Sequence, residues 1–489
     1  MQSRPARTGA RFFQASGSPP RGRRLHAGAD YCASPVAVDQ SLRGFLEALE
    51  RDGELRRVAG PVSPRFELSA ILAGEDAGPA LLFESVEGSG IPVVGGVLGS
   101  RARLAAGIGV TFGELQGRML EALAAPIAPR EVAGAPCQEL VIESPDLATL
   151  PIPWFFEHET GPYLTAAAIV ARDGAAGPAN LSIARLKPLG GARAMAGIAP
   201  NHHLAVLARR AADRGETLPI AATIGNHPAV MLASTLYLGL GEDELEVAGG
   251  LLGEPVEVAR TAAGLAVPAH CEIVLEGRLD VGEQVLEGPV SEFHGHYEDY
   301  GTGSVVTFER MTMRRDAVLQ VVEPGRHPEH LLLGGVSIAA GLAAMLRRTM
   351  PGVRAVAVPE GGAGRLTAVV SLEPQARPGS AQRAMFAVWA AVTLIRTVTV
   401  VDADVDVWDH AEVEWARTAY ARPDRDLLVA PGAVADRSEP LASHGRVAKL
   451  GIDATRKAAD RADHRVAAPP RAALEAALRR RDPGASSTT

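Results

Sequence analysis

The sequence predicts an α+β protein in which a β-rich central segment lies between two α/β segments. Three observations support this fold class. Residues 39–135 combine a periodic helical pattern with short apolar runs, residues 136–322 hold many short β-like runs separated by Gly and Pro, and residues 323–465 alternate helical and β-like patterns. Short strands at close spacing are typical of a barrel or a sandwich, whereas alternating helices and strands indicate an α/β unit. We therefore expect three folded domains with these boundaries.

The N-terminal segment is expected to begin with a helix. The stretch DQSLRGFLEALERDGELRRV has apolar residues at helical spacing and then a glycine, so a helix should open near residue 39. The apolar runs ALLFESV and IPVVGGVLG follow it and predict strands. Together they favour a mixed α/β unit.

The other two segments differ in how strands and helices are mixed. The central β-like runs are YLTAAAIVARD, LPIAATIG, HCEIVLEGRL and SVVTFERMTMRR, and one helical run, HHLAVLARRAADRG, ends on a glycine as helices commonly do. In the C-terminal segment the helical runs VSIAAGLAAMLRRTM and SAQRAMFAVWAAVTLI alternate with VRAVAVP, LTAVVSL and TVTVVDADVDVWD. That alternation predicts a separate α/β domain.

The two ends of the chain differ in composition from the folded segments. Residues 1–38 carry six arginines and no acid before Asp30, with Pro, Gly and Ser scattered between them. This composition suits a disordered extension or a transit-like leader, and we expect the extension. Residues 466–489 contain RAALEAALRRR and predict a helical tail.

The overall composition argues against several partners. The chain has 49 basic and 57 acidic residues, a net charge of -8, and no basic block after the first thirty residues, so nucleic acid is not expected as a partner. Cys32, Cys137 and Cys271 form no C-x-x-C pair, which fits a reducing compartment. The best apolar run that we identify, at 384–395, is shorter than the ~20 residues a membrane span needs. We expect a cytoplasmic protein with no membrane partner.

Two glutamates surround a Gly-Pro pair in LEGPVSEFHGHYED, residues 286–299. On an even strand Glu287 and Glu292 would point to opposite faces, because side chains alternate with period two. They are therefore either unrelated surface charges or a pair that a turn brings together.

Four other polar residues form a mixed oxygen and nitrogen set. Asn180 lies in NLSIAR, His202 and His203 lie at an expected helix start, and Glu244 precedes a helical run. An amide oxygen, an imidazole and a carboxylate suit Mn²⁺ or Mg²⁺ better than zinc. Spacing alone does not establish a metal site, since such residues more often cap helices or contact solvent.

The motifs resemble those of a known family when they are taken in order. The series NLSIAR, PNHHL, TIGNHPA, GEDELEVAGGLLGEP, VPAHCEIVLEG, LEGPVSEFHGHY and KLGIDAT resembles the UbiD-type decarboxylases, which use prenylated FMN. The resemblance runs from about residue 40 to 460. It implies a central FMN-binding split β-barrel domain, flanked by an N-terminal α/β domain and a C-terminal α/β oligomerisation domain.

The resemblance also implies a flavin site with a metal ion. Asn180, His203 and Glu244 match the residues that hold Mn²⁺ or Mg²⁺ against the flavin phosphate, with His202 as the competing ligand and K⁺ as a further candidate ion. The matching cofactor-binding residues are Asn180, Ser182, Ile183, Ala184, Arg185, His202, His203, Glu244 and Lys449.

The family's catalytic Glu-Arg-Glu set maps onto Glu287, Arg185 and Glu292. Gly288 tolerates unusual dihedral angles and Pro289 fixes its own, so the segment can turn and let both acids face one pocket. Arg185 would hold the substrate carboxylate, Glu287 would orient Arg185, and Glu292 would supply the proton that replaces CO₂.

The resemblance leaves the substrate and the direction of reaction open. The expected substrate is an α,β-unsaturated or (hetero)aromatic carboxylic acid, with a prenyl-flavin synthase as cofactor supplier and a homodimer or higher oligomer as the assembly. The alternatives are a carboxylase or subunit of a phenol-carboxylating complex, and a non-catalytic flavin-binding subunit. Val290 and Ser291 stand where the family often has an aromatic residue and a glycine. His294 and His296 are a proton relay or, more in keeping with their place beside the turn, structural.

Overall fold

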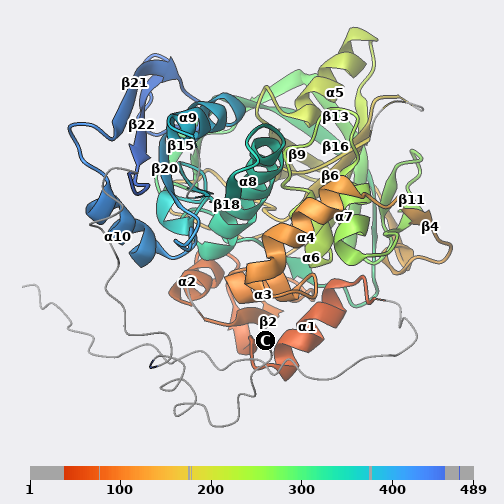
Figure 1. Cartoon of the computed structure of the whole chain (residues 1–489). Helices are drawn as coiled ribbons and strands as arrows, with labels where there is room; N and C mark the ends of the chain where they lie inside the picture. The colour runs from red at the N-terminus through yellow and green to blue at the C-terminus, as the bar shows by residue number, and fades with distance from the viewer. Residues whose placement is uncertain are drawn as a thin grey trace, which may run out of the picture. The chain divides into compact units, whose positions relative to one another are not determined.

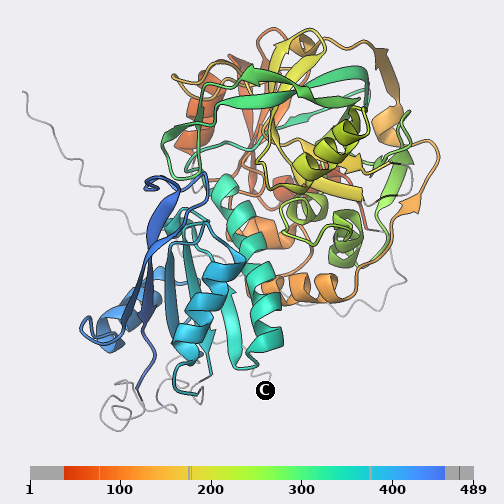
Figure 2. The same ribbon diagram turned by 90° about the horizontal axis from the view of Figure 1, so that it is seen from above.

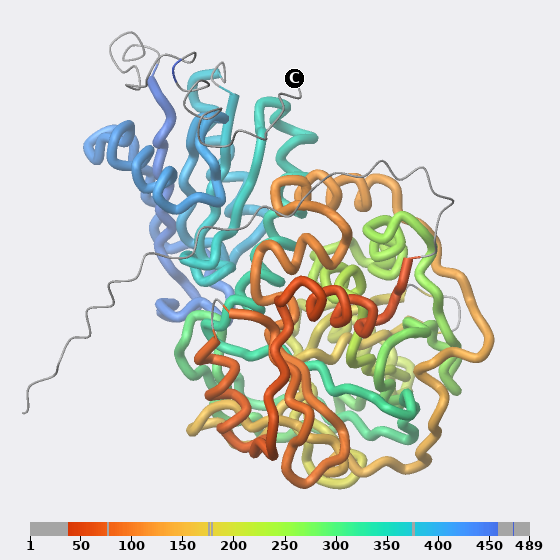
Figure 3. Tube along the Cα trace, turned by 90° about the horizontal axis from the view of Figure 1, so that it is seen from below, coloured from red at the N-terminus to blue at the C-terminus, as the bar shows by residue number. Residues whose placement is uncertain are grey.

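The structure is a computed structural model that describes residues 38–75, 78–174, 177, 179–373, 377–457 and 473. Figure 1 shows the helices and strands, and Figure 3 lets the chain be followed from α1 at its red end to β22 at its blue end. The expected extension over residues 1–38 and the expected tail over residues 466–489 lie outside the described residues, apart from Val38 and Ala473.

A four-stranded sheet carries the first apolar runs of the chain. Its order is β1-β2-β3-β17, and its strands span Leu55–Val62, Ala80–Val86, Val93–Gly95 and Leu319–Gln320. The helices of this segment are α1 (Leu42–Arg51), α2 (Glu67–Gly74), α3 (Arg101–Ala106) and α4 (Phe112–Ala124). Helix α1 begins where the sequence predicts a helix, because the Ser41 side chain accepts a hydrogen bond from the backbone N–H of Gly44 and caps it.

The central sheet has eight strands in the order β7-β6-β10-β13-β16-β9-β8, with β5 paired to β16. The strands span Leu140–Glu143 (β5), Ala168–Arg172 (β6), Ala179–Ile183 (β7), Arg185–Gly190 (β8), Arg193–Gly197 (β9), Leu218–Ile224 (β10), Ile273–Leu286 (β13) and Thr302–Met313 (β16). Strands β7 and β8 stand at opposite ends of this path, yet Ala184 alone separates them in the chain. The sheet must therefore curl until its ends approach each other.

The curled sheet is open in the part of the chain that the structure describes. Strands β7 and β8 are not neighbours in its hydrogen-bonded order, so these residues form no closed barrel. The predicted mixed α+β class is confirmed, whereas the finer split-barrel description is not confirmed by the strand pairing. The central helices are α5 (His203–Asp213), which lies where the sequence predicts it, α6 (Pro228–Ala233) and α7 (Glu244–Leu252).

Smaller elements complete the central segment. A three-stranded sheet has the order β12-β11-β4, with strands Ala266–Pro268, Glu257–Arg260 and Arg130–Glu131. Strands β14 (Pro289–Ser291) and β15 (Tyr297–Asp299) pair antiparallel. Short 3₁₀ turns span Pro136–Gln138 and Leu147–Thr149 in this segment, and a third spans Glu360–Gly362 in the C-terminal segment.

The C-terminal segment is the α/β unit that its alternating pattern predicts. Its five-stranded sheet has the order β18-β19-β20-β22-β21, with strands Val353–Ala357, Thr367–Leu372, Thr397–Asp402, Arg446–Asp453 and Leu427–Val434. Its helices are α8 (Pro328–Thr349), α9 (Ser380–Ala391) and α10 (His410–Tyr420). In Figure 2, α8 (cyan) lies beside the strands of this sheet and also borders the orange and green segments.

Helix α8 is apolar on more than one side because it packs into two cores. Leu332 and Val336 belong to the cluster built around the N-terminal segment, and Ile338 and Leu342 belong to the cluster under the C-terminal sheet. The helix is long and apolar enough, by length and composition, to cross a membrane, but 78% of the tested stretch is buried inside the structure. The prediction that residues 384–395 hold the best apolar run overlooked this helix and was wrong on that point. Burial between two cores explains its composition.

Candidate active site

A cavity of about 180 Å³ lies between the central sheet and the first turns of α8. Its polar lining includes Glu159, Arg185, Glu292, His330 and Arg365. Its apolar lining includes Phe155, Ile183, Ala184, Val290, Val322 and Leu333. Charged groups on an apolar wall are typical of a small-molecule site.

The chain turns between the two glutamates of the Gly-Pro stretch, and of the two only Glu292 is among the residues that line this cavity, whereas Glu287 contacts Arg185 of the cavity wall. Gly288 has a φ of 77°, in the left-handed region that glycine adopts without strain. A Cβ at this position would lie 2.6 Å from Cγ2 of Thr160, so a side chain would also clash. Strand β13 ends just before Glu287, and Glu292 follows the short strand β14. The predicted turn is confirmed.

Arg185 is held between the two glutamates. Its Nε lies 2.6 Å from Oε1 of Glu287 and its Nη2 lies 3.0 Å from Oε2, so this pair is bidentate. Its Nη1 lies 3.7 Å from Oε1 of Glu292, an ion pair that is too long for a hydrogen bond. Burial lowers the pKa of Arg185, but hydrogen bonds and charge from Glu287 outweigh that effect, so the net pKa is raised. The guanidinium therefore stays charged at the cavity wall.

Two further side chains fix the backbone of Glu287. Nζ of Lys187 donates to the Glu287 carbonyl oxygen at 2.7 Å, and Oγ1 of Thr160 donates to the same oxygen at 2.7 Å. Burial lowers the pKa of Lys187. The Glu287 side chain is 2% exposed. Glu287 is therefore held at its backbone by Lys187 and Thr160, and at its carboxylate by Arg185.

Asn180 and Glu244 meet, as the sequence resemblance implies. Nδ2 of Asn180 donates to Oε1 of Glu244 at 3.0 Å, and the backbone N–H of Leu181 donates to Oε2 at 2.7 Å. Oγ of Ser182 donates to Oδ1 of Asn180 at 3.0 Å. Burial raises the pKa of Glu244 to about 7. The pair joins the start of β7 to the first turn of α7.

The two adjacent histidines are in different situations. His202 is the N-cap residue of α5, and its Nδ1 is buried with no hydrogen-bond partner among the described residues. Burial lowers the pKa of His202 to about 4, so the ring is neutral and can act as a ligand. His203 is the first residue of α5. Among the described residues no group of three or more His, Cys, Asp or Glu side chains is placed to hold a metal, so neither histidine is shown to join Asn180 and Glu244.

Lys449 lies apart from the cavity lining. Its Nζ donates to the carbonyl oxygens of Thr393 and Ile395 at 2.6 Å and 2.8 Å, within the C-terminal segment. Burial lowers its pKa. Of the other residues that the resemblance implies, Ile183 and Ala184 line the cavity.

Four residues of the cavity wall were not identified from the sequence. Glu159 accepts hydrogen bonds from the backbone N–H and Oγ of Ser291, and burial raises its pKa. The hydroxyl of Tyr163 is buried with no partner among the described residues. His330 and Arg365 come from the C-terminal segment. Arg365 lies in the glycine-rich stretch PEGGAGR, which matches no dinucleotide- or phosphate-binding motif.

Tyr300 connects the site to a loop of the C-terminal segment. The guanidinium carbons of Arg185 and Arg437 lie 5.2 Å and 4.2 Å from the centre of its ring, and its hydroxyl lies 2.9 Å from Oγ of Ser438. Nearby, Nε2 of His294 lies 3.4 Å from Oε1 of Glu298, and its ring centre lies 5.5 Å from that of His296. Neither histidine is among the residues that line the cavity.

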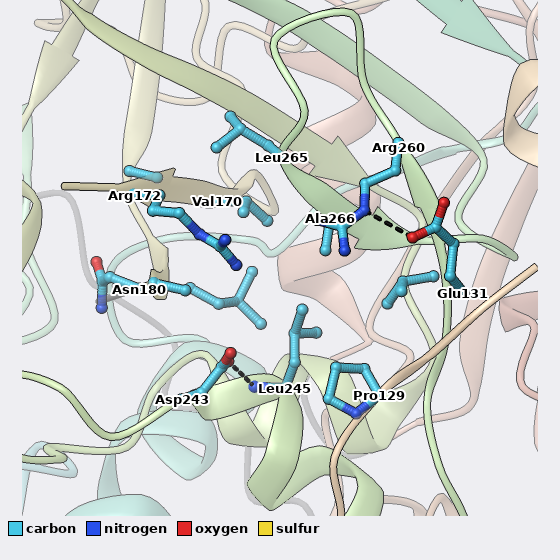
Figure 4. Close-up of a pocket in the computed structure, with 14 residues that line it drawn as sticks. Pro129, Glu131, Val170, Arg172, Asn180, Asp243, Leu245, Arg260, Leu265 and Ala266 are labelled. Atoms are coloured by element: carbon cyan, nitrogen blue, oxygen red, sulfur yellow. Dashed lines mark hydrogen bonds and ion pairs between the residues drawn. The ribbon is translucent and has the colours of Figure 1, made fainter. Parts of the chain in front are cut away.

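A second cavity, of about 130 Å³, lies beside β7 and α7. Figure 4 shows the Arg172 side chain pointing into it, whereas the Asn180 amide points away from it. Nε of Arg260 and Oε2 of Glu131 form an ion pair of 2.9 Å at its edge. The Asn180 amide therefore faces Glu244 and not this cavity.

Comparison with known proteins identifies the family. Residues 46–123, 130–327 and 331–454 match the N-terminal, Rift-related and C-terminal domains of UbiD, 3-octaprenyl-4-hydroxybenzoate carboxy-lyase. Anhydromevalonate phosphate decarboxylase of Methanosarcina mazei is 36% identical over 419 residues, which are 85% of this chain and 96% of that protein.

Solved structures agree with this match. HmfF of Pelotomaculum thermopropionicum, a UbiD-class enzyme solved with FMN, is 36% identical with a TM-score of 0.83, over 90% of this chain and 99% of HmfF. An evolved dimeric form of HmfF, solved with prFMN, is 36% identical with a TM-score of 0.80, and the match covers 88% of this chain and 97% of that protein. Vanillic acid decarboxylase of Sedimentibacter hydroxybenzoicus is 27% identical with a TM-score of 0.81, and the match covers 91% of this chain and 99% of that protein. The chain belongs to the UbiD family of decarboxylases.

Proposed function

We propose that the protein removes CO₂ from an α,β-unsaturated or (hetero)aromatic carboxylic acid, with prenylated FMN as its cofactor. The observation that carries the proposal is the arrangement at the cavity wall, where Arg185 is bound to Glu287 through two hydrogen bonds and lies 3.7 Å from Glu292. Breaking the bond to a carboxylate needs a group that accepts the electron pair, and no side chain of the cavity can do this. Prenylated FMN would supply that electron sink when bound.

The residues at the cavity fit a flavin. Ile183 and Ala184 offer an apolar wall next to Arg185, and the buried hydroxyl of Tyr163 has no protein partner among the described residues, so a ligand can satisfy it. The relatives solved with FMN and prFMN support this assignment. We also propose that the curled central sheet, which brings β7 and β8 to this wall, is the split barrel that the family resemblance implies.

Each of the three charged residues would have its own task. Arg185 uses Nε and Nη2 on Glu287, which leaves Nη1 to hold the substrate carboxylate. Glu287 uses both oxygens on Arg185 and so orients it. Glu292 keeps the looser contact and is the carboxyl group free to deliver a proton to the carbon that loses CO₂.

The Asn180–Glu244 pair is proposed as part of a Mn²⁺ or Mg²⁺ site near the flavin phosphate. The amide now donates to the carboxylate, and an amide oxygen together with a carboxylate oxygen would supply two of the oxygen ligands that such a cation accepts. The orphaned Nδ1 of His202 favours this residue as the nitrogen ligand over His203. K⁺ and Lys449 remain further candidates for the same phosphate.

The remaining features of the proposed enzyme come from the family expectation. We propose a cytoplasmic enzyme, at least dimeric, that receives its cofactor from a prenyl-flavin synthase. The carboxylase, the phenol-carboxylating subunit and the non-catalytic subunit stay as alternatives. CO₂ exchange into product at high bicarbonate would reveal a carboxylase, and the assembled Arg185 cluster disfavours a silent subunit.

The proposed function predicts dependence on a modified flavin. Protein produced without prenylated FMN should be inactive on a panel of unsaturated acids, and co-production with a prenyl-flavin synthase should give CO₂ release together with a changed flavin absorbance. The panel is followed by CO₂ detection and by absorbance of the purified protein. Equal turnover with plain FMN, or with no flavin, would contradict the proposal.

The proposed metal site predicts linked losses of metal and flavin. Replacing Glu244 or His202 by Ala should lower both contents together, because the ion and the phosphate would hold each other in place. His203→Ala is the matched control and should retain both. Metal analysis and flavin absorbance of the purified variants measure the result, and the reverse pattern would assign the ligand to His203.

A further inference from the structure

Arg365 is a cavity-lining arginine that lacks the partner an enclosed charge needs. It follows the 3₁₀ turn Glu360–Gly362 and lines the same cavity as Arg185 and Glu292. No carboxylate in the described part of the chain lies within ion-pair distance of it. Its recorded contacts are a hydrogen bond from Nη1 to the His330 carbonyl oxygen at 3.4 Å and the face of Phe293, 4.9 Å from Cζ to the ring centre. Arg185, by contrast, lies within ion-pair distance of two carboxylates, those of Glu287 and Glu292.

A glycine in α8 leaves the space that this guanidinium occupies. A Cβ on Gly334 of α8 would lie 2.5 Å from Cζ of Arg365, so any side chain there would displace it. The guanidinium therefore packs closely against α8 at Gly334, and its other N–H groups have no hydrogen-bond partner among the described residues. Burial lowers the pKa of Arg365, which is the sign of a charge held without enough compensation.

His330 lines the same cavity as the two arginines, and its backbone carbonyl oxygen accepts from Arg365. Its Nδ1 lies 3.2 Å from the Gly325 carbonyl oxygen, which can only accept, so Nδ1 carries the proton. Burial, then the charges of Arg365 and Arg185, lower the pKa of His330 to about 3, so the ring is neutral. Glu292 lines the same cavity as both arginines and lies 3.7 Å from Arg185, and its charge raises the pKa of each.

We propose that Arg365 binds a second anionic group of the substrate, a carboxylate or a phosphate, which is distinct from the carboxylate that leaves as CO₂. This inference rests on the proposed function and adds the substrate class. Arg185 would hold one end of the substrate, Arg365 the other, and Glu292 would stand between them beside the reacting carbon. An unpaired enclosed cation is costly, so a substrate that brings the missing negative charge gains affinity at this point.

The test compares three acids with one skeleton: but-2-enoate, which has one anionic group, and pent-2-enedioate and 4-phosphooxybut-2-enoate, which have two and are called dianions for that reason. The flavin-loaded wild type should prefer one of the two dianions over but-2-enoate in kcat/KM by on the order of 10- to 100-fold, the range of a charge-assisted hydrogen bond. Arg365→Met should erase that preference, so that kcat/KM becomes similar for the three acids, and the variant should still bind flavin, while Arg365→Lys should keep part of the preference. The dianion with the higher kcat/KM shows whether the second anionic group that Arg365 binds is a carboxylate or a phosphate. Arg348→Met, on the exposed end of α8, is the control for general charge effects.

Three results would overturn the inference. A wild type with no preference for either dianion would remove it, and so would an equal loss on all three acids in Arg365→Met, which would assign Arg365 to the leaving carboxylate. Loss of flavin absorbance in Arg365→Met would show instead that Arg365 binds the cofactor.

Calorimetric binding of the saturated acids butanoate, pentanedioate and 4-phosphooxybutanoate separates this inference from the proposed function. If no unsaturated acid is turned over but a saturated dianion binds more tightly than butanoate, and Arg365→Met abolishes the difference, the anion site stands while the proposed reaction fails. Equal binding of all three overturns the site itself.

Discussion

Glu292→Gln should abolish most turnover while the substrate still binds. Glutamine keeps the size and shape of a side chain that lies 3.7 Å from Arg185, but it has no proton to give to the carbon that loses CO₂. We expect kcat to fall by roughly 10²- to 10⁴-fold, the usual contribution of a general acid, with little change in substrate affinity. Steady-state kinetics and equilibrium binding on the flavin-loaded variant measure the two effects separately.

Solvent deuterium gives an independent measure of the same step. The wild type should exchange the hydrogen at the former carboxylate carbon of the product for deuterium, and Glu292→Gln should slow this exchange in parallel with kcat. Glu298→Gln, in the neighbouring strand β15, is the matched control and should behave as wild type. Near-normal turnover of Glu292→Gln, with the exchange lost in Glu287→Gln instead, would reverse the two roles.

Glu287→Gln should damage binding and rate together. Glu287 is 2% exposed and takes two hydrogen bonds from Arg185, at 2.6 Å and 3.0 Å, so its loss leaves an enclosed guanidinium without its anion. We expect KM to rise and kcat to fall, each by on the order of tenfold or more, as for a lost hydrogen bond between charged groups. The free energy of unfolding should also fall by about 3 kcal/mol, because one partner of a buried pair is removed.

The control for this variant is Glu283→Gln, near the end of the strand β13 that precedes Glu287. Glu283 also pairs with an arginine, Arg193, but its side chain is 48% exposed, and exposed pairs contribute roughly 0–1 kcal/mol. Thermal or denaturant unfolding measures the loss of stability in both variants, and steady-state kinetics measures their KM and kcat. Both losses should be larger for Glu287→Gln, whose ion pair is enclosed, than for Glu283→Gln, whose ion pair lies at the surface. If Glu287→Gln loses only stability and keeps its KM and kcat, Arg185 is not oriented by Glu287 for the reaction.

Periodic patterns predicted the elements of this fold well, because burial of one face leaves a regular trace in the sequence. Helices α1 and α5 and strands β2, β10, β13 and β16 lie where such patterns predict them. Strand β17 has only two residues and carries no period, so its place in the N-terminal sheet could not be predicted. The composition of α8 could not tell a membrane span from a helix buried between two cores.

The site was predictable where one local segment carries its geometry. The turn at Gly288 follows from Gly-Pro, and it brings Glu287 and Glu292 to Arg185. Neighbouring residues such as His202 and His203 could not be told apart, since burial of one ring nitrogen depends on the helix start and its surroundings. Arg365 was missed for the same physical reason, because its importance comes from what surrounds it in space.

Strand β17 also constrains how the chain is made. It pairs parallel with β3 through Leu319↔Val93 and Gln320↔Val94, partners more than 200 residues apart in the sequence. A growing polypeptide therefore presents the open edge of β3 until the whole central segment has left the ribosome. Open edges invite pairing with other chains, and contacts of such long range form slowly. This enzyme's vulnerability to aggregation should be concentrated in that interval of biosynthesis, and it ends when one two-residue strand docks.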